Sequence, residues 1–570
     1  MLASRWFALG TALALASQAH AEPPLPLLSE PSLPVDATAP EPGSGTTAGT
    51  GAAAGPFTLP QAADSGTVRL DAANFPYGVV APPPEPSGRG WSITPSLGLE
   101  LLATDNLYQS HTNRRADFVT SVVPGLLLSV DTSRLRGLLN YEPSIEFHVA
   151  RGEQNRVDQN FNGQVLATVV PDSVFLDIRG AGATQAASGG YAPQGLAVTD
   201  RNNRVQTSSV QISPYFVHRF GGLGTVQIGY AFQAVSQDIG GNGIGGGRDD
   251  GGFTPNGQRY FSDQDFTAHE FYAVGRTGEN FGPLAFQTRL DSTSYDGTGV
   301  LDGAYRRIAS VEARYAVTRT ILALVEGGYE GQRYRGVPGI EISEPVWAVG
   351  GRLNFSPDSW ITAKYGHHDG FNSATVDAVI GVGGRTQIFA NYAERLTTNA
   401  QRAVDLLAAT TLDEQGNPVD SETGAPTAQP FADSFLGVQS NLFRVRRGAI
   451  SVSQTWPRDR ITLTLSREDR QPVSVEAGTT AFSQRGTSGS LTWSHDLTPA
   501  TSTVGSVQYG RFNSPGSGRG DVFSASAALV TQLMPRLSAF AQYALTTRGD
   551  DYASGRALQN VVLVGLRQTF

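Results

Sequence analysis

Apolar and polar side chains alternate with a period of two residues from Trp91 to the end of the chain. In Ile321–Tyr329 and in Trp347–Phe355, every second residue is apolar or small. In Ile461–Ser466, isoleucine and leucine alternate with threonine and serine. A β-strand points successive side chains to opposite faces, so each run predicts a strand with one apolar and one polar face.

The connections between these runs are alternately short and long. About ten short turns, such as Asp131–Arg134 and Gly383–Arg385, alternate with about eleven loops that are often long and include 235–263, 367–373 and 395–436. This layout is typical of outer-membrane barrels and predicts about 22 strands, within a range of roughly 18–24. Because a sheet in lipid cannot leave an edge unpaired, we expect an all-β, transmembrane antiparallel β-barrel over residues 90–570. A water-soluble sandwich or propeller is the alternative, but the strongly polar second face argues against it.

The first 21 residues have the pattern of a secretory signal peptide. Arg5 precedes the apolar run Trp6–Ala16, and Ala19 and Ala21 lie just before an expected cleavage site ahead of Glu22. Residues 22–89 are rich in Pro, Ala and Gly, so we expect a largely disordered periplasmic leader. No later stretch of about 18 apolar residues predicts a membrane helix.

Composition excludes several classes of site. The chain has no cysteine, which excludes disulfides and thiolate chemistry. Its net charge of −9 argues against a nucleic-acid partner. Lys364 is the only lysine among 42 basic residues, and arginine is suited to gripping the phosphates of outer-membrane lipid and lipopolysaccharide. A codon bias explains the same excess. We expect no metal and no cofactor.

Alternation also predicts which polar side chains face the barrel interior. Leu284, Phe286 and Leu290 are expected to face lipid, which turns their neighbours inward. The pore-lining candidates are Arg136, Asn140, Glu142, Gln287, Arg289, Asp291, Glu312, Arg314, Glu326, Arg352 and Lys364. Opposed rows of these charges would set a transverse field in a pore. Alternatively, the charges pair with one another and only keep the lumen wet.

The last strand resembles the assembly signal of bacterial outer-membrane proteins. That resemblance rests on a terminal Phe570, alternating apolar residues and an internal glycine. The residues that carry it are Val562, Val564, Gly565, Leu566 and Phe570. It implies recognition by the barrel-assembly machinery, and it predicts that deletion of Phe570 impairs assembly. Gln568 departs from the pattern, because an apolar residue is usual there.

Residues 99–177 resemble the β-barrel porin 2 family. The resemblance rests on several short motifs: Asp105–Tyr108, Asp117–Thr120, Val123–Gly125, Ser133–Arg134, Tyr141 and Phe175–Asp177. It implies an outer-membrane barrel across residues 90–570. Some members of that family are linked to exopolysaccharide or protein-sorting gene clusters, but the resemblance says little about cargo.

Three functions fit these patterns, and all place the chain in the outer membrane. The first is a porin-like pore for hydrophilic solutes, and the second is the outer-membrane part of an exopolysaccharide export system. The third is a structural or adhesive barrel closed by its loops. An energised nutrient receptor also has about 22 strands, but residues 22–90 are too few and too Pro-rich for its plug domain.

One long loop and one pair of histidines complete the candidate features. Within the loop 395–436, Ala400–Ala409 predicts a short helix that folds into the mouth as a constriction. His367 and His368 precede Asp369 at a strand end, where a hydrolytic barrel would place a serine nearby. No such geometry follows from the sequence, and we expect no enzyme activity.

Overall fold

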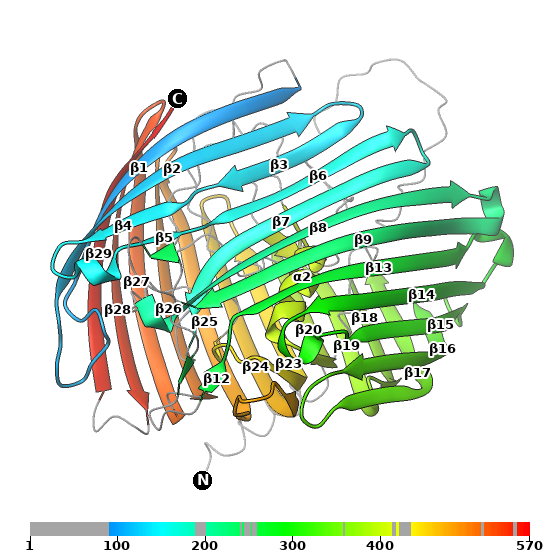
Figure 1. Cartoon of the computed structure of the whole chain (residues 1–570). Helices are drawn as coiled ribbons and strands as arrows, with labels where there is room; N and C mark the ends of the chain where they lie inside the picture. The colour runs from blue at the N-terminus through cyan, green and yellow to red at the C-terminus, as the bar shows by residue number, and fades with distance from the viewer. Residues whose placement is uncertain are drawn as a thin grey trace, which may run out of the picture.

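The computed structural model is an all-β antiparallel barrel that closes on itself (Figure 1). It describes residues 90–187, 201–239, 242–243, 252–253, 259–356, 359–412, 418–420, 435–514, 518–550 and 556–570. The predicted signal peptide and leader, with Ala19, Ala21 and Glu22, therefore lie outside the described residues. Among the described residues, no helix has the length and apolar character needed to cross a membrane.

The wall of the barrel follows the chain order. Its first half comprises β1 (Trp91–Thr104), β2 (Asp117–Asp131), β3 (Leu135–Tyr141), β4 (Ser144–His148), β5 (Arg156–Asp158), β6 (Phe161–Val170), β7 (Val174–Ala186), β8 (Arg204–Arg219), β9 (Gly224–Ile239), β13 (Gln264–Thr277), β14 (Leu284–Gly297) and β15 (Tyr305–Ala316). Its second half comprises β16 (Ile321–Tyr334), β17 (Ile340–Ser356), β18 (Ser359–His368), β19 (Phe371–Val382), β20 (Thr386–Thr397), β23 (Asn441–Thr455), β24 (Asp459–Val475), β25 (Gln484–Thr498), β26 (Thr501–Ser514), β27 (Gly518–Met534), β28 (Leu537–Asp550) and β29 (Arg556–Thr569). Short pairs outside this wall are β10 (Asn242–Gly243), β11 (Gly252–Phe253) with β12 (Arg259–Phe261), and β21 (Thr410–Leu412) with β22 (Pro418–Asp420).

The barrel has 22 membrane crossings, which confirms the expected strand number. The main sheet has 25 strands, but β3 and β4 both pair with β2 and form one broken crossing. In the same way β5 and β6 pair with β4 and β3, and the two-residue β10 is not a crossing. Antiparallel pairing of β1 with β29, from Ser96 to Thr104, joins the first and last strands. Because the barrel is closed, no unpaired strand edge is exposed to lipid.

The two ends of the barrel differ as the sequence predicts. Tight turns such as Gly383–Arg385 connect strands at the end where β1 begins and β29 finishes. By the usual layout of such barrels this is the periplasmic end, and the long connections are extracellular. One predicted loop is shorter than expected: residues 367–373 contain only the two-residue turn Asp369-Gly370 between β18 and β19. The residue pair takes positive φ, which suits a tight reversal.

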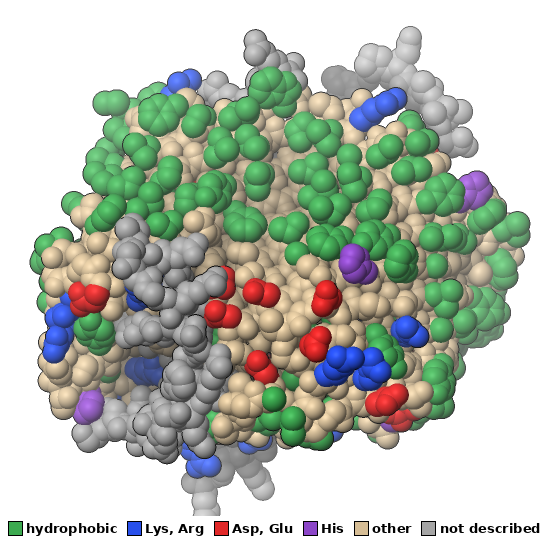
Figure 2. Space-filling view, viewed as in Figure 1, with side chains coloured by type: hydrophobic (Ala, Val, Ile, Leu, Met, Phe, Trp, Pro, Cys, Tyr) green, Lys and Arg blue, Asp and Glu red, His purple; other side chains and the backbone are tan. Residues whose placement is uncertain are grey.

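The outer face of the wall is an apolar belt (Figure 2). Leu463 and Leu465 on β24 are exposed, while the intervening Thr464 hydrogen bonds to Ser451 on the inner face of β23. In the same way Val325 on β16 and Val349 on β17 are half exposed. A closed barrel with this belt satisfies every backbone group in lipid and presents hydrocarbon to hydrocarbon. The chain is therefore an outer-membrane β-barrel.

Candidate functional site

All eleven predicted pore-lining residues lie on the inner side of the wall, and four of them form one network. Glu312 on β15 accepts hydrogen bonds from Arg314 at 2.5 Å and from Lys364 on β18. Arg314 also donates to Gln287 on β14 at 3.1 Å. The network ties three strands together across the inner face.

The other predicted residues lie in separate places along the inner wall. Arg289 and Asp291 are buried neighbours with 4.0 Å between Nη2 and Oδ2. Glu142 pairs with Arg567 of the last strand, and the Arg352 guanidinium lies 4.4 Å from the centre of the Trp360 ring. Arg136 pairs with Asp131 at 3.4 Å near the periplasmic turn, and Asn140 faces the buried Leu127. Glu326 lines the cavity described below. The prediction did not show which of these residues contact one another. Alternation tells which face of a strand a side chain lies on, but not its position along the barrel axis.

Interior charges pair locally with residues two positions away on the same strand. Arg179 donates to Asp177 at 2.8 Å, and Arg470 donates to Glu468 at 2.5 Å. Residues at i and i+2 share one face of a strand, so each pair neutralises itself within the wall. Of the two arrangements left open by the sequence, these contacts favour local pairing over opposed rows of charge.

A helix lies inside the barrel, as the sequence predicts. Helix α2 spans Asn399–Ala409 and follows β20 (Figure 1). Its first turn is held by a reciprocal capping box: the Gln401 amide donates to Thr398 Oγ1, and the Thr398 amide donates to Gln401 Oε1, both at 3.0 Å. The Thr-x-x-Gln spacing at 398–401 is a sequence pattern that could have marked the start of α2.

The apolar face of α2 packs against the wall across the lumen from its own strand. Ala400, Ala403, Val404 and Leu407 are buried in one cluster with residues from β7, β9 and β13. The same cluster contains residues from the other side of the lumen, including Leu396 of β20 and Tyr334 of β16. Although α2 follows β20, its most extensive packing against the wall is with β7, β8 and β9. The helix therefore bridges the interior rather than lying along one side.

Polar contacts fix the remaining faces of α2. Arg402 makes a two-pronged ion pair with Glu468 of β24 at 2.6 and 3.1 Å. Arg395, at the end of β20, donates to Asp405 of the helix at 2.6 Å. Two-pronged pairs of this kind set orientation as well as contributing energy. The sequence analysis did not identify these four charges, because the partners lie 66 and 10 residues apart in the chain.

The turn Asp369-Gly370 anchors the chain just before α2. Asp369 is buried and accepts hydrogen bonds from the Leu396 amide at 3.0 Å and from Gln332 at 2.6 Å. His368 Nδ1 lies 3.1 Å from the same carboxyl, and Glu330 accepts from the Gly370 amide at 3.2 Å. We call Glu330, Gln332, His368 and Asp369 the latch.

Charge and burial act in opposite directions on the Asp369 carboxyl. Burial alone would raise its pKa, but His368 and the Arg306 guanidinium outweigh burial and hold the pKa of Asp369 below its usual value. Ligand atoms of Glu330, His368 and Asp369 lie within 4.8 Å of one another, a spacing that also suits a cation. Hydrogen bonds to Gln332, Gly370 and Leu396 already explain why these side chains lie close together, and they give the group a structural role.

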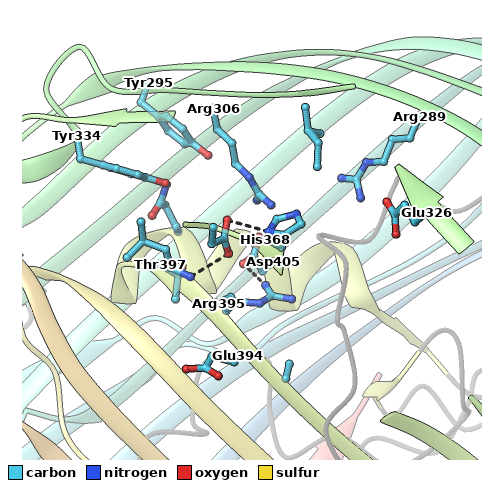
Figure 3. A pocket seen from close by; sticks show the side chains of 15 residues that line it. Arg289, Tyr295, Arg306, Glu326, Tyr334, His368, Glu394, Arg395, Thr397 and Asp405 are labelled. Carbon is cyan, nitrogen blue, oxygen red and sulfur yellow. Dashed lines mark hydrogen bonds and ion pairs between the residues drawn. The ribbon is translucent and has the colours of Figure 1, made fainter. Parts of the chain in front are cut away.

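A cavity lies between α2, the latch and the inner wall, with a volume of about 640 Å³ that includes the open space at its mouth (Figure 3). Arginine and tyrosine side chains line it, together with carboxylates: Arg289, Arg306, Arg395, Tyr295, Glu326 and Glu394. Such a lining offers donors, acceptors and aromatic faces to a polar solute.

Above α2, chain segments from several strands meet near the extracellular end. The Val438 amide donates to the carbonyl of Ala187 at 2.8 Å, and the Ser262 amide donates to Ser440 Oγ at 2.7 Å. Val337, in the β16–β17 connection, pairs with Val475 at the end of β24. These contacts join strands that are not neighbours in the wall, so they narrow the lumen beyond what α2 alone fills.

The predicted assembly residues occupy the closing strand. Val562, Val564, Leu566 and Phe570 are all exposed on the outer face. Gly565 lies on the opposite face, where an added Cβ would come within 2.3 Å of the Phe540 ring. Glycine therefore lets the Phe540 ring pack against the closing strand. Their role in assembly stays a prediction.

Comparisons with known proteins give distant structural likenesses. No family model matches the sequence and no curated protein matches it, so the likeness to the β-barrel porin 2 family stays a resemblance. The chain is similar in structure to the ferric-catecholate import receptor Fiu of E. coli K12 in its open form (TM-score 0.43, 9% identity, 84% of this chain and 82% of that one). It is also similar to BauA, the ferric preacinetobactin receptor of Acinetobacter baumannii (TM-score 0.46, 9% identity, 84% and 80%). A third likeness is to OccK2 of Pseudomonas aeruginosa in complex with glucuronate (TM-score 0.34, 9% identity, 84% and 98%).

Proposed function

We propose that this barrel is an outer-membrane pore for hydrophilic solutes whose passage is narrowed by α2. The observation that carries the proposal is a polar inner wall in which ion pairs and one turn hold the polar side of a helix, while its apolar side packs in one cluster. Two ion pairs hold the helix, Arg402 with Glu468 and Arg395 with Asp405. Water or a polar solute can replace either partner in such a pair.

The path past α2 has the chemistry of a solute route. The cavity beside the helix combines Arg289, Arg306 and Arg395 with Glu326 and Glu394. Because both signs of charge are present, the lining suits neutral or zwitterionic polar solutes as well as ions. A barrel of 22 strands is wide enough to hold a channel around an inserted element.

The test is conductance of the purified full chain in a planar bilayer. We expect the intact protein to conduct, and a deletion of Thr398–Asp433 to raise the single-channel conductance because it removes α2. Arg402→Ala should give a smaller rise, since it breaks one attachment of the helix. Arg485→Ala is the matched control, because Arg485 pairs with Asp469 on the exposed outer face at 2.7 Å.

An exopolysaccharide export barrel is the second candidate. The contacts between 435–441 and distant strands favour it, because a barrel gated by a partner needs a closed resting state. Such a barrel would be silent when intact and conduct only after the deletion. Silence in both forms, with the folded barrel verified by its heat-modifiable gel migration, would contradict the pore and favour a structural or adhesive barrel.

A further inference from the structure

Two arginines on the outer face of the barrel gather around one tyrosine. Arg307 of β15 and Arg333 of β16 are exposed on the same outward face as Val311, Val325 and Tyr329. The Arg307 guanidinium lies 4.8 Å and the Arg333 guanidinium 5.2 Å from the centre of the Tyr305 ring. The strand register explains this, because Tyr305 is the cross-strand partner of Arg333 and shares a face with Arg307.

No carboxylate in the part of the chain that the structure describes neutralises these two arginines. Among the described residues, neither guanidinium has a carboxylate oxygen within 4 Å. Glu341 is the register partner of Arg333, yet it does not approach within that distance. Three other exposed arginines near the extracellular end are paired: Arg335 with Asp302 at 3.3 Å, Arg485 with Asp469 at 2.7 Å, and Arg556 with Asp521. The geometry thus keeps a concentrated positive charge available to an external anion.

A groove runs along the outer wall beside these arginines. Its volume is about 1240 Å³, including the open space at its mouth. Small residues such as Ala309 and Gly331 form its floor, and Phe271, Leu290 and Tyr329 form its sides. A Cβ added at Gly331 would meet no atom within 4 Å, so the floor is open there. Apolar sides and an arginine at one end match an acyl chain with a charged head.

The position of the groove selects the occupant. Tyr305 and Arg307 lie at the beginning of β15, which is its extracellular end, and the exposed Val311 and Tyr315 follow on the same outward face. Aromatic side chains collect at the membrane–water boundary, where lipid head groups lie. Arginine binds phosphate with two parallel hydrogen bonds, and its charge is permanent.

We propose that Arg307 and Arg333 bind the phosphate of a lipid A-type glycolipid in the outer leaflet, with an acyl chain in the groove. The chemistry required is a phosphate ester on a lipid, held by two guanidinium groups over the Tyr305 ring. This site lies on the outside of the barrel and does not depend on whether the lumen conducts.

Native mass spectrometry of the full chain, released from detergent with added lipid A, tests the site. Each guanidinium contributes a charge-assisted hydrogen bond, so the double variant Arg307→Gln, Arg333→Gln should retain lipid A at least about tenfold more weakly. The matched control Arg335→Gln, Arg485→Gln removes two exposed arginines that already have carboxylate partners and should bind as the wild type does. Dephosphorylated lipid A should bind the wild type as weakly as lipid A binds the double variant.

Three results would overturn the proposal. One is retention of lipid A by the double variant at the wild-type level, and another is equal retention of dephosphorylated lipid A. The third is displacement of lipid A by an equal amount of phosphatidylglycerol, which would show a general anion site. If the glutamine variant fails to fold, Arg307→Lys, Arg333→Lys keeps the charge without the two-pronged geometry and should bind with intermediate strength. Gly331→Leu fills the groove and should weaken both lipid A forms.

Discussion

The two faces of the same strands follow different rules in this barrel. On β24 the outward Leu463 and Leu465 meet lipid, while the inward Glu468 pairs with Arg470 and with Arg402 of α2. A side chain on the outer face needs only to be apolar and to sit at the right depth. A charge on the inner face needs a particular partner, because burial without one costs several kcal/mol.

The difference shows where specificity is stored. Many outward residues can be exchanged for other apolar residues, whereas each inward charge depends on a particular partner in the wall or in α2. Arg307 and Arg333 are exceptions on the outer face, since they are charged and lack a protein carboxylate. The comparison therefore predicts that substitutions of equal chemistry have unequal effects on the two faces.

The largest expected effect comes from breaking the buried charge group at Glu468. Glu468→Ala leaves Arg402 and the almost fully buried Arg470 without their carboxylate. We expect a loss of about 3–5 kcal/mol in the free energy of unfolding, measured by urea denaturation in liposomes. Asp521→Ala removes the carboxylate of the exposed pair with Arg556 and should cost at most about 1 kcal/mol. Equal costs would contradict the distinction between the two faces.

A charge placed on each face of one strand gives the next largest difference. Leu463→Arg puts a guanidinium against hydrocarbon and should cost about 2–4 kcal/mol near the bilayer midplane. Thr464→Arg points the same group into the polar interior and should cost little. The amount of folded, heat-modifiable barrel after assembly measures both. A reversed order would mean that the strand register is shifted by one residue.

The sequence predicts the wall better than the contents of the lumen. Alternation at Ile461–Leu465 is a local signal, so the facing of these residues and the strand number could be read directly. Helix α2 was also within reach, because Thr398-x-x-Gln401 is a local capping pattern. These elements can be predicted from local patterns, because residues close in sequence determine whether a strand or a helix cap forms.

Contacts across the lumen are not local, and the sequence does not reveal them. Asp369 meets Leu396 and Gln332 because β16, β18 and β20 curve around a common interior. Nothing in the residues around position 369 indicates these partners, and the predicted loop 367–373 placed Asp369 in a longer exposed connection. The pairing of Arg307 and Arg333 over Tyr305 depends on the register of two strands, which is fixed only when the barrel closes.

The capping box of α2 provides a smaller test of the interior. Thr398→Ala removes the side chain that accepts from the Gln401 amide and should destabilise the helix by about 1 kcal/mol. Hydrogen exchange should become roughly five times faster in α2, following that free energy. Ser453→Ala, on the inner face of β23, removes a hydroxyl of similar size outside the helix and should leave α2 exchange unchanged. Unchanged exchange in Thr398→Ala would mean that packing alone holds the helix.

The smallest expected effect is the pH dependence of the latch. Because the folded pKa of Asp369 lies below the value of a free aspartate, its charged form stabilises the fold above about pH 4, and the contribution is lost only as the pH falls further. Exchange of the α2 amides, corrected for its intrinsic pH dependence, should therefore be constant between about pH 8 and pH 5 as far as Asp369 is concerned. Asp369→Asn should raise it already at neutral pH, because His368 and Arg306 then face no carboxylate at that position.

Two other titratable groups face Asp369, and the experiment separates them by pH. His368 and Glu330 lie in the same junction, with 3.6 Å between His368 Nδ1 and the Glu330 carboxylate. Burial lowers the pKa of His368, but Asp369 and Glu330 outweigh burial and raise that pKa above its ordinary value of about 6.5. A change in α2 exchange above about pH 6.5 would therefore assign the latch to His368 rather than Asp369. Asp302→Asn, in the exposed pair with Arg335, is the matched control and should leave α2 exchange unchanged at every pH. An equal effect of both aspartate variants would show that the inner position of Asp369 gives it no special role in holding the helix.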